Sequence, residues 1–279
     1  MRMAFVITIS LSLPLVAIAS TRDLAPELES HLDASMGCEY GYLQNLNPDG
    51  RCTIRILNSL GNAVLIGDSH AGHLSEAFVE AAHALQLDAT VAVNGNRPFL
   101  FTPWDVNQTR ESYPFRSLET MAIFRPRVVV IAQSNYNIDS PADVSWADQF
   151  TPILRQLESM GIPVVVVASS LAPGFRPREC SIFQMYIREC PADKEISTSK
   201  LLRDRNLRLE QEKLAISRVG NSVLIDAAPI LCPASTCSVY RDGEWWWRDD
   251  AHLSIVATKS LIPLMTERIK AALALPIGD

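Results

Sequence analysis

The chain has no run of basic residues, and aromatic residues make up only 7% of its 279 positions. Lysine and arginine number 25 against 31 aspartates and glutamates, which gives a formal net charge of −6. Proteins that bind nucleic acids carry clustered basic side chains, so this balance argues against a DNA or RNA partner. Internal repeats and low-complexity tracts are absent as well. A composition of 48% hydrophobic and 20% charged residues suits one globular domain, with at most a small N-terminal addition.

The sequence also lacks a Cys-x-x-Cys motif and any histidine–cysteine cluster with zinc-site spacing. It therefore does not favour a metal centre, and we expect no cofactor. The six cysteines instead fall in close pairs along the chain: Cys38 and Cys52, Cys180 and Cys190, Cys232 and Cys237. This spacing favours three local disulfides, although six cysteines allow 15 different pairings.

The first 20 residues differ from the rest. Arg2 precedes an uncharged apolar stretch over residues 3–19, which ends in Ala17-Ile18-Ala19. A basic start, an apolar core and an Ala-x-Ala end are typical of a secretory signal peptide, and an uncleaved signal anchor is the alternative. Either one places the domain outside the cytoplasm, in the periplasm or beyond, where paired cysteines form disulfides. We expect a signal or anchor over residues 1–20, an irregular leader over 21–60 and a catalytic domain over 61–279.

Apolar runs alternate with helical patterns along the domain. The runs over residues 63–67, 89–93, 128–132, 164–168 and 222–226 are predicted strands, and amphipathic stretches between them are predicted helices. The run over 128–132 is apolar throughout, as in a strand that is buried on both faces. This alternation predicts an α/β fold, a three-layer α/β/α sandwich with a parallel sheet of about five strands.

Ser69 lies in the turn that ends the first of these strands. The apolar run stops at Gly67-Asp68, and an amphipathic helical pattern begins a few residues later. A hydroxyl at this place lies at the carboxyl end of a parallel strand, where open α/β sheets bind ligands. It also lies near a helix N-terminus, whose N–H groups favour developing negative charge. Ser69 is thus a candidate nucleophile, and the alternative is a serine that only caps the helix.

Asp249 and His252 stand just before the last predicted helix. An acid three residues before a histidine can fold back to hold the imidazole as a general base. Ser69, Asp249 and His252 therefore supply the three parts of a serine hydrolase triad. Asp250 is the rival of Asp249, but its spacing from His252 is less favourable. His70 adjoins Ser69 and is expected to point elsewhere.

Gly67-Asp68-Ser69-His70 and Asp249-Asp250-Ala251-His252 together resemble the SGNH (GDSL-like) hydrolase superfamily. More narrowly, they resemble the SGNH domains fused to membrane O-acyltransferases of the acyltransferase family 3 type. The resemblance covers roughly residues 60–275. It implies an SGNH, flavodoxin-like fold and a serine that carries an acyl group. It also adds a third origin for residues 1–20, as the remnant of the last membrane helix of a fused acyltransferase.

The same resemblance implies an oxyanion hole. Its donors would be the N–H groups of Ser69 and Gly95 and the side-chain amide of Asn135. The family usually shows Gly-x-Asn at the last position, whereas this chain has Gln133-Ser134-Asn135, which departs from the pattern at the glycine. In the plainer interpretation Gly95 is a turn glycine and Asn135 caps a turn.

These residues predict acyl transfer through an acyl-serine. The resemblance implies an acylated or acceptor glycan as substrate, which makes the protein an acetylesterase or an O-acetyltransferase of extracytoplasmic carbohydrate. A transferase would need a membrane partner that supplies the acyl group. The alternative is a catalytically silent carbohydrate-binding or scaffold domain of a system that modifies envelope polysaccharide. The sequence leaves the acyl group, the glycan and the oligomeric state open.

Overall fold

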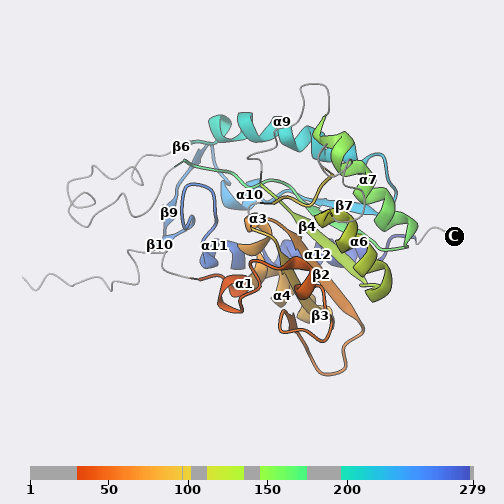
Figure 1. Cartoon of the computed structure of the whole chain (residues 1–279). Helices are drawn as coiled ribbons and strands as arrows, with labels where there is room; N and C mark the ends of the chain where they lie inside the picture. The colour runs from red at the N-terminus through yellow and green to blue at the C-terminus, as the bar shows by residue number, and fades with distance from the viewer. Residues whose placement is uncertain (1–29, 96, 102–111, 135–144, 175–195, 277–279) are drawn as a thin grey trace, which may run out of the picture.

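The computed structural model describes residues 30–95, 97–101, 112–134, 145–174 and 196–276 (Figure 1). At its centre is a six-stranded sheet with the strand order β1-β3-β2-β4-β5-β7. Neighbouring strands are parallel except for β1 and β3 at one edge, which are antiparallel. The predicted sheet of about five parallel strands is confirmed, and β1 adds a short edge. The strands are β1 (Thr53–Ile54), β2 (Asn62–Gly67), β3 (Asp88–Val93), β4 (Val128–Ala132), β5 (Val164–Val167) and β7 (Ser222–Ile225).

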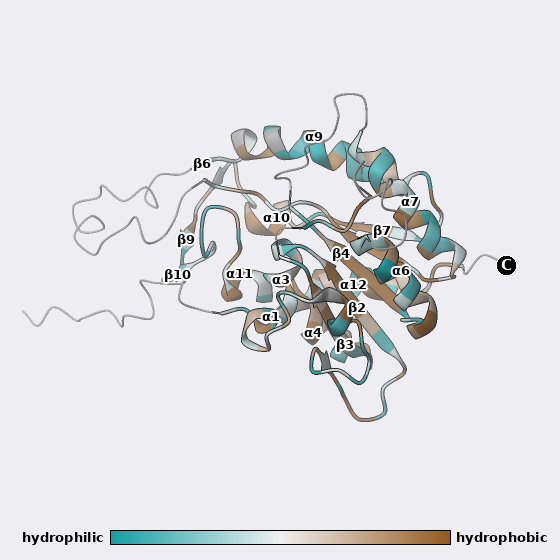
Figure 2. Ribbon diagram, in the orientation of Figure 1, coloured by the Kyte–Doolittle hydropathy of each residue, from teal (hydrophilic) through white to brown (hydrophobic). Residues whose placement is uncertain are grey.

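The central strands form because their side chains are apolar toward both faces. Every residue of β2, β4 and β5 is buried, and β4 appears brown in the hydropathy view of Figure 2. β4 and β5 consist almost entirely of valine, with one isoleucine and one alanine, and β-branched side chains pack well on a pleated sheet. Such runs are expected where helices cover both sides of a parallel sheet.

Helices do cover both faces, so the domain has three layers (Figure 1). Successive residues of a strand point to opposite faces. Accordingly, Leu65 of β2 belongs to one hydrophobic core and Val64 to the other. The helices on the Leu65 face are α4 (Ser75–Ala84), α11 (Ile255–Lys259) and α12 (Ile262–Leu273), and those on the Val64 face are α6 (Tyr113–Phe124), α7 (Trp146–Ser159) and α9 (Thr198–Ile216).

The parallel strands place a switch point between β2 and β4. Their spatial order is second, first, third, fourth, fifth. The chain therefore places β3 on one side of β2 and β4 on the other. Sheets of this order bind ligands at the carboxyl ends of the strands beside the switch point. Gly67 ends β2 there with a φ of 148°, and a Cβ on it would lie 1.7 Å from the carbonyl oxygen of Ala132 in β4. Only glycine therefore allows this close approach.

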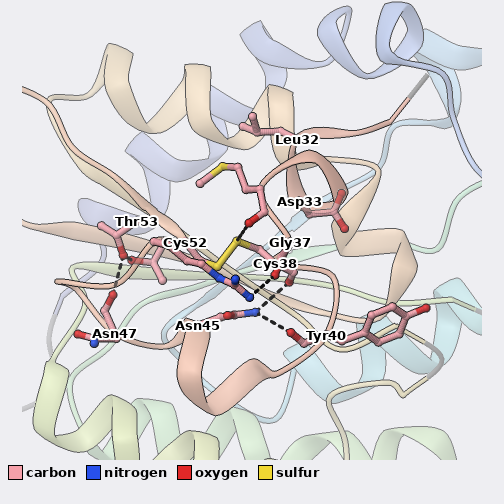
Figure 3. The surroundings of a disulfide bond; sticks show 12 residues. Leu32, Asp33, Gly37, Cys38, Tyr40, Asn45, Asn47, Cys52 and Thr53 are labelled. Carbon is pink, nitrogen blue, oxygen red and sulfur yellow. Dashed lines mark hydrogen bonds between the residues drawn. A yellow bond between two sulfur atoms is a disulfide. The ribbon is translucent and has the colours of Figure 1, made fainter. Parts of the chain in front are cut away.

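The described part of the expected leader is held against the β3 edge of the sheet. It contains two short helices, α1 (Leu32–Ser35) and α2 (Tyr42–Asn45), followed by β1. The disulfide Cys38–Cys52 joins this segment to the residue before β1 (Figure 3). Its two Cα atoms are 5.8 Å apart. The first predicted pairing is therefore confirmed, and both cysteines are completely buried.

A second disulfide, Cys232–Cys237, connects two short elements near the end of the domain. These are α10 (Ala228–Leu231) and β8 (Thr236–Cys237), and β8 pairs with β6 (Ile196–Ser197). This pairing was also predicted and is confirmed. Cys180 and Cys190 lie outside the described residues, so their pairing stays a prediction.

The chain ends in a hairpin and two helices. The hairpin, β9 (Tyr240–Arg241) and β10 (Glu244–Trp245), turns at Asp242-Gly243, and both turn residues have positive φ. The sequence favours one final helix over about 252–273 with a bend at Pro263, and the structure has two helices instead. α11 ends at Lys259 and α12 starts afresh, because Pro263 suits the first turn of a helix, where no N–H donor is needed. No helix in the described ranges is long and apolar enough to cross a membrane.

Candidate active site

Ser69 opens a short helix directly after β2. This helix, α3 (Ser69–Gly72), begins at the switch point, because Gly67 turns the chain out of the sheet. Asp68 is the N-cap residue, and its Oδ1 accepts a hydrogen bond of 2.9 Å from the N–H of His70. The capping role that the sequence left open for Ser69 is therefore filled by Asp68. The Ser69 hydroxyl is left available for another partner.

That partner is His252, which in turn contacts Asp249. Ser69 Oγ lies 2.8 Å from His252 Nε2, and His252 Nδ1 lies 2.9 Å from both carboxylate oxygens of Asp249. An ionised carboxylate only accepts hydrogen bonds, so Nδ1 must carry the proton that it donates to Asp249. Nε2 is then the acceptor for the Ser69 hydroxyl. The structure brings together three side chains that are up to 183 positions apart in the sequence.

Asp249 stays ionised in this arrangement. Burial by itself would raise the pKa of Asp249, but the hydrogen bonds from the imidazole of His252 and from the N–H groups of Ala251 and His252 outweigh burial. The pKa of Asp249 is therefore held well below its ordinary value. Asp249, rather than its rival Asp250, makes the contact with the imidazole, as the three-residue spacing indicated.

The loop that carries His252 is held by contacts on both of its sides. Trp247 and Leu253 form a β-bridge, and the N–H of Arg248 donates to the carbonyl of His252 at 2.8 Å. The Ser254 side chain then caps α11 by accepting from the N–H of Ala257. These contacts fix the backbone of residues 247–254, which limits the positions open to the imidazole.

Two more histidines, His70 and His73, lie near His252. The ring centroids of His70 and His73 lie 5.2 and 5.7 Å from that of His252. Burial lowers the pKa of His70 to about 4 and that of His73 well below its ordinary value, so both imidazoles are neutral near pH 7. Each has a buried Nδ1 without a hydrogen-bond partner in the described structure. From its place on the first predicted helix His73 would be read as a structural residue, but it also lines the cavity beside Ser69.

The end of β4 is tied to the nucleophile turn. Asp68 Oδ2 accepts hydrogen bonds from both the N–H and the hydroxyl of Ser134, each at 2.8 Å. The Arg208 guanidinium donates to the carbonyl of the same serine at 3.2 Å. Asn135, the predicted oxyanion donor, is the next residue and lies outside the described residues. Its role stays a prediction.

Gly95 lies at the end of β3 and also lines the cavity. In this structure its N–H donates to the carbonyl of Glu39 at 3.0 Å. A Cβ on this residue would approach a ring carbon of Tyr40 to 2.9 Å. The predicted oxyanion donor therefore has a partner from the N-terminal segment, and it could serve an oxyanion only if that contact shifted.

A cavity of about 150 Å³ opens beside Ser69 and His252. Five of the residues that line it come from the N-terminal segment: His31, Asp33, Ala34, Glu39 and Tyr40. Sequence reasoning missed all five, because nothing nearby in the sequence connects them to Ser69. One sequence feature did connect this segment to the domain, namely the predicted disulfide of Cys38. Across the described ranges, no group of three or more His, Cys, Asp or Glu side chains is placed to hold a metal ion.

Comparison with known proteins gives one family. The family model described as "SGNH domain (fused to AT3 domains)" matches residues 37–267. No curated protein sequence matches the chain. Among solved structures, the periplasmic domain of a lipopolysaccharide acetyltransferase from Salmonella ser. Paratyphi A superposes with a TM-score of 0.54 at 16% identity. That alignment covers 77% of this chain and 84% of the Salmonella chain, and at this identity it shows a shared fold. A proposed acylhydrolase from Bacteroides fragilis NCTC 9343 gives a TM-score of 0.43 at 13% identity, over 79% of this chain and 91% of that one.

Proposed function

Because this chain belongs to the family of SGNH domains that occur fused to AT3 domains, we propose that it transfers acyl groups through an acyl-enzyme formed on Ser69. The observation that carries the proposal is the continuous hydrogen-bonded chain from Ser69 Oγ through the His252 imidazole to the Asp249 carboxylate. A serine hydroxyl is a weak nucleophile unless a base removes its proton. This arrangement supplies the base and a group that orients the base.

In the proposed first step, Ser69 Oγ attacks the carbonyl carbon of an ester. His252 Nε2 takes the hydroxyl proton as the new C–O bond forms, and the carbonyl electrons move onto oxygen. The tetrahedral intermediate then collapses, the ester C–O bond breaks, and the leaving alcohol takes the proton from His252. The Asp249 carboxylate stabilises the imidazolium that exists between these events, since it is ionised and 2.9 Å from Nδ1.

In the second step, water or a sugar hydroxyl attacks the acyl-serine. His252 again takes a proton, this time from the incoming hydroxyl, and Ser69 leaves with that proton. Water as acceptor gives an esterase, and a sugar hydroxyl gives an O-acyltransferase. The oxyanion of each step would be held by the N–H of Ser69 at the start of α3, by the amide of Asn135 and by the N–H of Gly95 after release from Glu39.

We place this chemistry outside the cytoplasm, with a signal or anchor over residues 1–20 and the catalytic domain over 61–279. Support comes from the two disulfides, since such bonds persist in oxidising compartments, and from the apolar N-terminal sequence. The described N-terminal segment belongs functionally with the catalytic domain, because it lines the same cavity. We further propose an acylated or acceptor glycan as substrate and a membrane acyl donor as partner. Support for the glycan comes from the Salmonella neighbour, which is a lipopolysaccharide acetyltransferase domain, and support for the membrane partner comes from the family, which is named for its fusion to AT3 domains.

The test is p-nitrophenyl acetate turnover by the full chain, compared with Ser69→Ala and His252→Ala. We expect each substitution to lower kcat by about a thousandfold or more, because the two side chains act as one unit. Glu119→Gln, on the exposed face of α6, is the control and should leave turnover unchanged. Equal turnover in all four proteins would overturn the triad. Absence of turnover together with absence of fluorophosphonate labelling at Ser69 would favour a silent binding domain.

A further inference from the structure

We propose that residues 31–40 form the sugar-binding wall of the active site, with Tyr40 stacking on a pyranose ring and the Asp33 and Glu39 carboxylates accepting hydrogen bonds from its hydroxyls. This inference rests on the proposed acyl transfer, because it concerns the sugar that carries or receives the acyl group. It goes further by assigning the subsite to a segment that precedes the strands and helices of the sheet domain.

The segment is anchored to the elements that carry the triad. His31 Nε2 donates to the carbonyl of Leu253, the residue after His252, at 2.9 Å. His31 Nδ1 lies 2.9 Å from Glu76 of α4, and the N–H of Leu32 donates to the same carboxylate at 2.7 Å. His31 is only 2% exposed. The His31 end of the wall is thus held both by α4 and by the loop of the proposed base.

Asp33 lies directly against the helix that begins with the nucleophile. Its N–H donates to the Ser75 hydroxyl, and a Cβ on Gly72 of α3 would come within 2.3 Å of Asp33 Oδ2. Glycine at this position is what allows the carboxylate to approach the α3 backbone. Asp33 lines the cavity together with Ser69 and His252. Burial raises its pKa, but an acceptor oxygen is available in either protonation state.

Tyr40 supplies an aromatic face at the same cavity. Tyr40 is 58% exposed, and its ring lies beside Gly95, just after the end of β3. Figure 3 shows that the side chains of Asp33 and Tyr40 point to the same side, away from the Cys38–Cys52 disulfide. The face of an aromatic ring is electron-rich and attracts the weakly positive C–H groups of a sugar ring. An exposed ring beside a polar cavity is therefore suited to stack on a sugar.

The remaining polar groups of the cavity match hydroxyls better than a strongly charged ligand. Glu39 adds a second carboxylate to the wall, and Arg248 contributes a cation to the cavity lining. His73 lines the same cavity, is 2% exposed and has an Nδ1 atom without a partner in the described structure. Neutral imidazole both donates and accepts hydrogen bonds, as a sugar hydroxyl does. A pyranose in this cavity would offer hydroxyls to both carboxylates and to the polar groups around them.

The experiment compares two esters that form the same acetyl-serine but differ in the leaving group. One is a methyl glucopyranoside acetylated at its primary hydroxyl, and the other is p-nitrophenyl acetate. In the full chain, we expect Tyr40→Ala to lower the ratio of kcat/KM for the sugar ester to that for p-nitrophenyl acetate about tenfold, mostly through KM. Tyr40→Phe should restore the ratio, because stacking needs the ring and not the hydroxyl. Glu39→Gln should lower the ratio about threefold or more.

Glu119→Gln is the matched control for the carboxylate and should keep the wild-type ratio. Unchanged ratios in both Tyr40→Ala and Glu39→Gln would overturn the inference. Cleavage of p-nitrophenyl acetate with no cleavage of the sugar ester by the wild type would also overturn it. Ser69→Ala separates this failure from failure of the proposed function. If Ser69→Ala keeps the cleavage, or the wild type cleaves neither ester, the proposed acyl transfer fails and the inference falls with it.

Discussion

Asp68 and Ser134 connect the turn of the nucleophile to the end of the neighbouring strand. One carboxylate oxygen of Asp68 accepts from the N–H and the hydroxyl of Ser134, while the other accepts from the N–H of His70. Asp68 is 2% exposed, so these bonds are shielded from water. The residue before the nucleophile thereby fixes the distance between α3 and the segment after β4.

Asp68→Asn should lower kcat while leaving the protein folded. The asparagine amide would place an NH₂ donor against the donors of Ser134 or His70, so at least one of these bonds is lost. We expect a loss of about 1–2 kcal/mol in the free energy of unfolding. Turnover of p-nitrophenyl acetate should fall about tenfold to a hundredfold, because Ser69 shifts relative to the oxyanion donors. Steady-state kinetics and urea unfolding would measure both effects.

Asp88→Asn is the matched control, because Asp88 also accepts a backbone N–H, that of Ile56, but at the opposite end of the sheet strands. It should lose stability and keep its turnover. Equal losses of turnover in the two variants would mean that Asp68 acts through general stability and has no positioning role.

The sheet could be predicted from local sequence because its strands are apolar throughout. The runs that end at Gly67 and Ala132 are typical of buried strands, and Ser69 follows the first of them after a single residue, Asp68. Asp249 and His252 are instead located by the last predicted helix, which they precede. The start of the first helix was less predictable. The amphipathic pattern after Ser69 favours a single helix over about 72–86. In the structure α3 begins at Ser69 and a separate α4 follows, because the Asp68 cap starts the first turn earlier.

The cavity wall could not be predicted, because its contacts span the whole chain. His31 contacts Glu76, 45 positions away, and Leu253, 222 positions away, and neither contact leaves a periodic pattern in the sequence. The hydrogen bond from the Gly95 N–H to the Glu39 carbonyl also joins residues that are far apart in the sequence. Local propensity gives the elements of the sheet, whereas the wall depends on tertiary packing of an irregular segment.

Asp249→Asn tests the ionised carboxylate through catalysis and through acid stability. Turnover should fall about a thousandfold or more, because asparagine no longer selects the tautomer of His252 that has a proton on Nδ1.

The folded-state pKa of Asp249 is depressed, so its carboxylate stabilises the fold above the unfolded-state pKa of about 3.9 and loses this effect as pH falls further. The stability difference between wild type and variant should therefore shrink below about pH 4. Urea unfolding at several acid pH values would measure the difference, and a difference independent of pH would contradict the assignment.

Glu212 should make stability fall as pH rises toward neutrality. Burial raises its pKa to about 7, against the opposing effects of the Ser169 hydrogen bonds and the Arg208 and Arg205 charges. The folded state therefore holds a proton that the unfolded chain releases above about pH 4.3, so this contribution declines until about pH 7. Glu212→Gln imitates the protonated acid and should flatten the decline. Glu210→Gln, at an exposed position of the same helix, should keep it. Parallel curves for all three proteins would contradict the prediction.

The disulfide Cys38–Cys52 should stabilise the protein more than Cys232–Cys237 does. It closes a loop of 14 residues against 5, and loop-closure entropy predicts about 3 kcal/mol for the first and about 2 kcal/mol for the second. Paired Cys→Ser variants measured by urea unfolding would give the two values.

The Cys38→Ser/Cys52→Ser variant should also raise KM for the monoacetylated sugar ester, because the disulfide holds the segment that carries Asp33 and Tyr40 against the end of β3. A rise in KM of equal size in the Cys232→Ser/Cys237→Ser variant would show that the sugar site responds to overall stability. A rise confined to the first variant would show that the disulfide positions the wall.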